Sequence, residues 1–149
     1  IEELQVLIDI IKTVAKFGKM VLPLHPRTRN KLNDFGLLAE LENMNELVLT
    51  GPIGYFEFQK LIKYAKVVLT DSGGIQEETT FRQVPCLTLR ENTERPVTIT
   101  EGTNTLVPIK ANAVEKHLKL IESGNYKIGA VPKLWDGRAT ERILEIIGV

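Results

Sequence analysis

A polar cluster follows an apolar run in the middle of the chain. Residues 66–70 read Lys-Val-Val-Leu-Thr, and Asp71, Ser72, Gly73 and Gly74 come next. A strand, a glycine turn and a helix in this order leave the first helical amides without internal partners, and glycines let the backbone approach a bulky anion. The positive end of the helix dipole favours a phosphate at the same place. The segment therefore predicts an anion site at Ser72, Gly73 and Gly74, with an ordinary tight turn as the alternative.

Glu78 lies about one turn inside the predicted helix. A carboxylate there could accept hydrogen bonds from a pair of sugar hydroxyls. The alternative is a helix residue that faces solvent. The segment is neither a Walker A loop nor a Gly-x-Gly-x-x-Gly dinucleotide fingerprint, so those two nucleotide sites are set aside.

Two further clusters are expected at the ends of neighbouring strands. Arg90 to Pro96 follows a strand that ends near Leu89, and Arg95 could pair bidentately with a phosphate. Arg90 is a second-rank candidate in the same run. The alternative for this run is an exposed charged loop without a ligand. His25 ends another strand; with an ordinary pKa of ~6.5 it could donate to a phosphate or move a proton. A purely structural histidine is the alternative there.

The elements that must position these residues alternate along the chain. Helical spacing predicts helices before Gly18, within residues 28–42 with a break around Gly36, and over residues 56–65, 73–81, 113–123 and 140–147. Apolar runs predict strands at residues 20–24, 46–50, 66–70, 85–89 and 105–107, those at 20–24 and 66–70 being buried. Short strands alternating with helices predict a Rossmann-like, doubly wound parallel α/β sheet in one domain over residues 1–149. Ligands bind such sheets outside the carboxyl ends of the strands.

Composition excludes several classes of function. The 149 residues carry 19 basic and 19 acidic side chains, so no net field favours nucleic acid or a membrane surface. Cys86, the single cysteine, predicts a buried thiol, and no ligand spacing suggests a metal site or a cofactor. No apolar run approaches the ~20 residues of a membrane span. We expect a cytoplasmic protein, and because the chain starts at Ile1 within a helical pattern, a fragment of a longer one.

Several motifs together resemble one family. They are Leu69–Glu78, Val84-Pro85, Leu89-Arg90, Thr93-Glu-Arg-Pro96, Glu101-Gly-Thr-Asn104, His25-Pro-Arg-Thr28, Asp136-Gly-Arg-Ala139 and Arg142-Ile143. This string is similar to the C-terminal half of the non-hydrolysing UDP-N-acetylglucosamine 2-epimerases of bacteria and archaea. The resemblance spans nearly the whole chain.

The resemblance implies a fold and a ligand. The fold is the second half of a glycosyltransferase-B-like, two-domain architecture with the active site between the halves. The roles it implies are Ser72, Gly73 and Gly74 at the UDP diphosphate, Glu78 at the ribose hydroxyls, Phe58 and the backbone near Ile53 at the uracil, and Arg95 at the phosphate region. For Phe58 the alternative is core packing.

The family reaction inverts C2 of UDP-N-acetylglucosamine by elimination and re-addition of UDP. The resemblance places the proton-moving acids in the other half, so no catalytic residue is assigned here and the chain alone is expected to be inactive. It implies a UDP-sugar as partner, a homodimeric full-length enzyme and a role in cell-surface polysaccharide synthesis. A face that meets the other half, including Ile143, Ile146 and Ile147, is expected to be exposed.

Three alternatives remain open. A 2-epimerase for another UDP-sugar, such as a diacetamido-uronic acid, shares the His-Pro-Arg-Thr form, and Thr79-Thr80-Phe81 differs from the continuation common in relatives. A glycosyltransferase nucleotide module shares the Gly-Gly-x-x-x-Glu pattern, although the Thr-Glu-Arg-Pro and Glu-Gly-Thr-Asn segments disfavour it. The last is a non-catalytic interaction domain derived from an enzyme.

Overall fold

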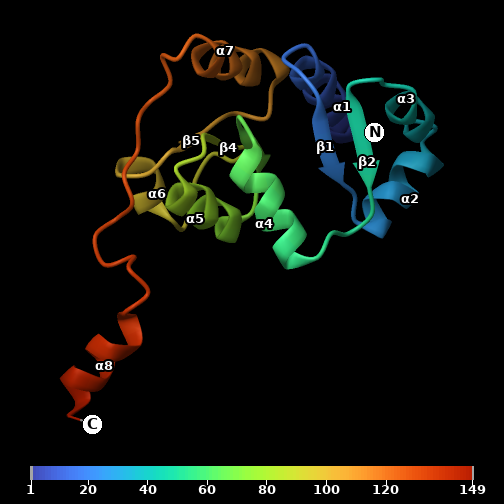
Figure 1. Ribbon diagram of the computed structural model, residues 1–149. Coiled ribbons are helices and arrows are strands. Elements are labelled where there is room, and N and C mark those ends of the chain that lie inside the picture. The colour runs from blue at the N-terminus through green and yellow to red at the C-terminus, as the bar shows by residue number, and fades with distance from the viewer. Residues whose placement is uncertain (1, 149) are drawn as a thin grey trace. The chain divides into compact units, whose positions relative to one another are not determined.

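The computed structural model describes residues 2–148, which form two compact units (Figure 1). One unit contains the residues up to Leu61 together with Val107–Asn125, and the other contains Ile62–Leu106 together with the residues from Tyr126 onward. Each unit is therefore assembled from two separate stretches of chain. Helix α4 (Tyr55–Tyr64) carries the chain from the first unit into the second.

The first unit is built on two parallel strands. Strand β1 (Met20–Pro23) pairs with β2 (Leu47–Thr50) in the register Met20↔Leu47 to Pro23↔Thr50. Its other helices are α1 (Glu2–Ala15), α2 (Pro26–Asp34), α3 (Leu38–Glu42) and α7 (Ala111–Glu122). Helix α7 packs on α1, although about a hundred residues separate them in the chain (Figure 1). The predicted break at Gly36 is confirmed, because Gly36 has a φ of +70° between α2 and α3.

An apolar core holds the first unit together. It consists of Ile8, Ile11, Leu24, Leu32, Leu38, Leu41 and Leu47, each at most 8% exposed. Five of these side chains lie on α1 to α3, Leu47 lies on β2, and Leu24 follows β1 directly. On α1 the spacing of three residues between Ile8 and Ile11 places both on one face of the helix.

The second unit contains three parallel strands. Strands β3 (Val68–Thr70), β4 (Cys86–Thr88) and β5 (Asn104–Leu106) lie in the order β3-β4-β5. Its helices are α5 (Gly73–Arg82), α6 (Pro96–Thr100) and α8 (Ala139–Ile147). The predicted α/β class with parallel strands is confirmed in both units. The sequence did not anticipate the short helix α6.

The burial predicted for two strands is wrong. Residues Val68–Thr70 are half-buried rather than buried, because β3 is an edge strand of its sheet. Along β1 only partial burial occurs as well, and Val21 is 42% exposed, because a sheet of two strands has no central strand. The buried thiol predicted for Cys86 is confirmed on the central strand β4, and burial raises the pKa of that thiol.

The core of the second unit is unusually polar. Its buried polar residues are Gln76, Thr79, Thr80, Thr88, Thr98, Thr103 and Asn104. Several hydroxyls bond to nearby backbone: Thr79 Oγ1 donates to the Ile75 carbonyl at 2.8 Å, and Thr103 Oγ1 donates to the Val84 carbonyl at 2.7 Å. Hydrogen bonding of this kind is what makes the burial of polar groups tolerable.

The segment after α7 closes the second unit. The Tyr126 hydroxyl lies 3.0 Å from the Thr103 carbonyl and 2.7 Å from Thr105 Oγ1, and burial raises the pKa of Tyr126 to about 12. Further along, the Ala130 amide donates to the Glu101 carbonyl at 2.7 Å. Gly129 has no side chain at the point of closest approach, where a Cβ would lie 2.5 Å from the carbonyl carbon of Gly102. Only glycine permits this backbone contact.

Helix α8 is fixed at its start and exposed along its length. Asp136 accepts from the Arg138 amide at 3.0 Å and from both terminal nitrogens of Arg142 at 2.9 and 3.0 Å. No residue of α8 is buried, and the predicted exposure is confirmed for Ile143, Ile146 and Ile147. Among residues 2–148, no helix has the length and apolar character needed to cross a bilayer.

Candidate functional site

The candidate site begins where β3 ends. Ser72 is the N-cap of α5, with extended backbone angles of φ −84° and ψ 128°, and its side chain makes no capping hydrogen bond. Its amide donates to Thr70 Oγ1 at 3.0 Å, which shapes the turn from strand to helix. Gly73 and Gly74 are the first helical residues, so their amides have no acceptor one turn earlier in the helix. The exposed Ser72 hydroxyl and these amides form a cluster of donors.

Arg95 brings a cation to this cluster. A Cβ placed on Gly73 would lie 3.9 Å from Arg95 Cγ and 4.0 Å from Arg95 Nε, so the side chain of Arg95 lies against Gly73. Its Nε atom is also 2.9 Å from Glu77 Oε1. The Nε–H is not aligned for a hydrogen bond, so this contact is a charge pair. The amino end of α5 therefore carries both its own dipole and a guanidinium, and both attract anions.

Glu78 and Arg90 lie in the same unit. Glu78 is half-buried on the second turn of α5, and Arg90 is half-buried two residues after β4, with its amide 2.9 Å from the Thr88 carbonyl. Among residues 4–148, whose side chains are described, neither of these two side chains forms an ion pair. Six of the sequence-predicted positions thus share the second unit, after neighbouring strands: Ser72, Gly73, Gly74, Glu78, Arg90 and Arg95.

Three other predicted positions belong to the first unit. His25 is exposed at the end of β1 and is the N-cap of α2, where its Nδ1 accepts from the Arg27 amide at 3.2 Å. With Nδ1 as acceptor, a neutral His25 ring carries its proton on Nε2. Ile53 is half-buried between β2 and α4, and Phe58 is half-buried on α4. His25, Ile53 and Phe58 are therefore described as part of the first unit, apart from the six predicted positions of the second unit.

Sequence reasoning missed Glu77, Gln76 and Thr93. Glu77 pairs with Arg95, Gln76 is completely buried, and Thr93 Oγ1 donates to Gln76 Oε1 at 2.6 Å. A usable signal existed for Thr93, since a threonine two residues before Arg95 can accept from that residue's amide and form a local turn. The hydrophobic periodicity of the sequence does not identify Gln76 as a core residue, because a polar residue at a buried position interrupts that periodicity.

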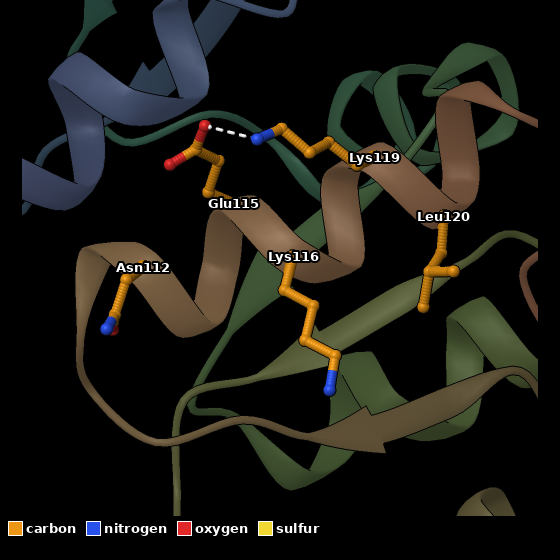
Figure 2. Close-up of a pocket in the computed structure, with 5 residues that line it drawn as sticks. All are labelled: Asn112, Glu115, Lys116, Lys119 and Leu120. Carbon is orange, nitrogen blue, oxygen red and sulfur yellow. Dashed lines mark ion pairs between the residues drawn. The ribbon is translucent and has the colours of Figure 1, made fainter.

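A separate hollow lies on α7 and is lined by Asn112, Glu115, Lys116, Lys119 and Leu120. Figure 2 shows Lys116 and Leu120 pointing away from the ion pair that Glu115 forms with Lys119 at 2.8 Å. Lys119 lowers the pKa of the Glu115 carboxyl. No sequence-predicted position lines this hollow. In the described part of the chain, no three His, Cys, Asp or Glu side chains are grouped so as to hold a metal ion.

Comparison with known proteins identifies the family. A family model described as UDP-N-acetylglucosamine 2-epimerase matches residues 1–148. The chain is 41% identical to a UDP-N-acetylglucosamine 2-epimerase of Methanococcus maripaludis over 98% of the chain and 40% of that protein. It is 35% identical to a UDP-2,3-diacetamido-2,3-dideoxy-D-glucuronate 2-epimerase of Pseudomonas aeruginosa over 86% of the chain and 34% of that protein.

A solved structure has the same fold. The UDP-GlcNAc 2-epimerase of Methanocaldococcus jannaschii, in complex with UDP-GlcNAc and UDP, superposes with a TM-score of 0.81 at 33% identity, over 99% of this chain and 41% of that one. The expected Rossmann-like fold of a glycosyltransferase-B-like epimerase is confirmed. The chain spans about 40% of the length of these relatives. From its sequence and its fold, the chain belongs to the UDP-N-acetylglucosamine 2-epimerase family.

Proposed function

We propose that this chain supplies the UDP-binding part of a non-hydrolysing UDP-N-acetylglucosamine 2-epimerase, which interconverts UDP-N-acetylglucosamine and UDP-N-acetylmannosamine. The observation that carries the proposal is the position of Arg95 against Gly73, at the start of α5. Free amides, a hydroxyl and a guanidinium together provide the donors that a diphosphate requires.

The nucleotide would bind along α5. Ser72, Gly73 and Gly74 would donate to the diphosphate, and Glu78, about one turn further along, would accept from the ribose hydroxyls. Ile53 and Phe58 are proposed beside the uracil, with His25 and Arg90 as second-rank phosphate contacts. The Nε2–H of His25 is the ring donor that remains, since Nδ1 already accepts from a backbone amide.

This arrangement suits the family reaction. Elimination of UDP places additional negative charge on the departing diphosphate, and fixed donors lower the free energy of that transition state. We assign no catalytic residue to this chain, and we expect residues 1–149 alone to bind UDP without epimerising a UDP-sugar. We further propose that the full-length enzyme is cytoplasmic and homodimeric and that it uses no cofactor.

The test is calorimetric titration with UDP of the protein expressed from its complete open reading frame. We expect saturable binding that weakens about 10- to 100-fold in Glu78→Ala, since hydrogen bonds to a charged group contribute roughly 1.5–3 kcal/mol. Glu122→Ala, which removes an exposed glutamate at the end of α7, is the matched control and should bind like the parent. Absence of UDP binding by the folded parent protein would refute the proposal.

A second substrate deserves a direct comparison. The Pseudomonas aeruginosa relative is named for a diacetamido-glucuronate substrate, and its identity to this chain is 35%. Incubation of the full-length protein with each UDP-sugar, followed by chromatography of the products, distinguishes the two activities. We expect UDP-N-acetylmannosamine from UDP-N-acetylglucosamine, and turnover of the diacetamido-uronate alone would favour the alternative.

A further inference from the structure

A buried network of side chains converges on one residue of the candidate site. Asn104, at the start of β5, is completely buried. Its Oδ1 accepts from Thr88 Oγ1 at 2.6 Å, while its Nδ2 lies 3.1 Å from Gln76 Oε1 and 3.0 Å from Thr98 Oγ1. One orientation of the Asn104 amide thus satisfies all three neighbours, and the reverse orientation would place its Oδ1, an acceptor, against the acceptor Gln76 Oε1.

The network ends on the backbone of Arg95. The Arg95 amide donates to Thr93 Oγ1 at 3.0 Å, and the Arg95 carbonyl accepts from Thr98 Oγ1 at 2.7 Å. Thr93 in turn donates to Gln76, and Thr98 in turn accepts from Asn104. Each threonine hydroxyl therefore acts once as donor and once as acceptor, and together the two hydroxyls bind both backbone polar groups of Arg95, its N–H and its C=O.

We propose that Gln76 and Asn104 are positioning residues for Arg95. Through Thr93 and Thr98 they fix the backbone of Arg95, and so hold its guanidinium against Gly73 at the start of α5. The inference rests on the proposed function in one respect, namely that the guanidinium placed there meets the diphosphate.

Stability alone does not account for the network. Apolar side chains of similar volume could fill the same space without any polar partners. Gln76 also buries its Nε2 donor without a hydrogen-bond partner among the described residues, which costs stability. The polar side chains add directional contacts. Hydrogen bonds have a preferred geometry and therefore fix the position of the Arg95 backbone, whereas apolar contacts do not.

The first test replaces Thr93, the link between Gln76 and Arg95. In the protein expressed from its complete open reading frame, we expect Thr93→Val to weaken UDP binding about tenfold and to leave the affinity for uridine, which has no phosphate, within about twofold. Thr93→Ser keeps the hydroxyl and should restore UDP binding. Thr103→Val is the matched control, since it removes a buried hydroxyl that bonds to the Val84 carbonyl, outside the network.

The second test asks whether the effect passes through Arg95. In an Arg95→Ala background, Thr93→Val should cause no further loss of UDP affinity. An equal loss for UDP and uridine, or the same loss of UDP affinity in the Arg95→Ala background, would overturn the proposal.

A structural readout separates this inference from the proposed function. The Nε–H resonance of Arg95 in an NMR spectrum should shift in Thr93→Val and in Asn104→Leu, and return in Thr93→Ser. If the parent protein binds no UDP, the proposed function is refuted. The Arg95 resonance then tests by itself whether the network positions Arg95. An unchanged resonance in both Thr93→Val and Asn104→Leu would refute it.

Discussion

The Nε atom of Arg95 lies 2.9 Å from Glu77 Oε1, so the cation proposed to meet the diphosphate is already paired with a carboxylate. Both side chains are 41% exposed. A pair with this much exposure is screened by water and contributes less than about 1 kcal/mol. A ligand phosphate can therefore compete with Glu77 for the guanidinium at small cost.

Removal of the Glu77 charge should strengthen nucleotide binding. Glu77→Gln leaves Arg95 without a competing carboxylate and removes a negative charge near the diphosphate. We expect UDP to bind two- to fivefold more tightly at low salt, with a smaller gain in 0.5 M salt, where screening is stronger. Titration calorimetry at both salt concentrations measures this. Glu91→Gln removes an exposed charge from the Arg90–Pro96 segment and should have the smaller effect; weaker binding by Glu77→Gln would contradict the prediction.

Ser72→Ala should separate binding from stability. A serine that caps a helix through its side chain typically contributes about 1 kcal/mol. Ser72 makes no such bond, so we expect the variant to unfold at the same urea concentration as the parent within error, while its UDP affinity falls about 5- to 20-fold. Loss of stability without loss of affinity would instead identify Ser72 as a cap.

Gly129→Ala should destabilise the second unit. The new Cβ would meet the Gly102 carbonyl carbon at 2.5 Å, and backbone cannot move aside as a flexible side chain can. We expect a loss of about 2 kcal/mol or more in the free energy of unfolding, measured by urea denaturation. Gly51→Ala, where a Cβ meets nothing within 4 Å, is the control and should change stability little.

The start of α8 should be sensitive to strong acid. Hydrogen bonds from Arg142, and then from the Arg138 amide, lower the pKa of Asp136 to about 2. Because the folded-state pKa lies below the unfolded value of about 3.9, this contribution is present above pH ~4 and is lost as pH falls through ~2. The Asp136 carboxyl shift and the amide protection of α8 should follow that course. Asp136→Asn should abolish the pH dependence, and a titration midpoint near 4 would contradict the prediction.

Local patterns in the sequence predicted most of the elements. The start of α5 at Gly73 and the break at Gly36 depend on neighbouring residues alone, so both were predictable. The half-burial of β3 could not be predicted in the same way. The burial of a strand depends on its place in the sheet, and the order of the strands is set by tertiary pairing.

The site was predictable only in part, for a related reason. Ser72, Gly73 and Gly74 form a local motif, and Arg95 follows a strand end, so each stands out in the sequence. The contacts that hold Arg95 connect residues up to 28 positions apart, as between Gln76 and Asn104. A buried glutamine or asparagine also looks like a surface residue in a hydrophobicity pattern, and only the fold brings the two amides together.

The interleaved course of the chain through its two units has a consequence for synthesis on the ribosome. The first unit needs residues 107–125, and the second needs residues from Tyr126 onward. The whole 62–106 segment of the second unit therefore leaves the exit tunnel before the first unit can be completed. Neither unit can finish folding as an isolated nascent domain. We expect the polar core around Gln76 and Asn104 to remain partly hydrated until the segment that begins at Tyr126 has been translated.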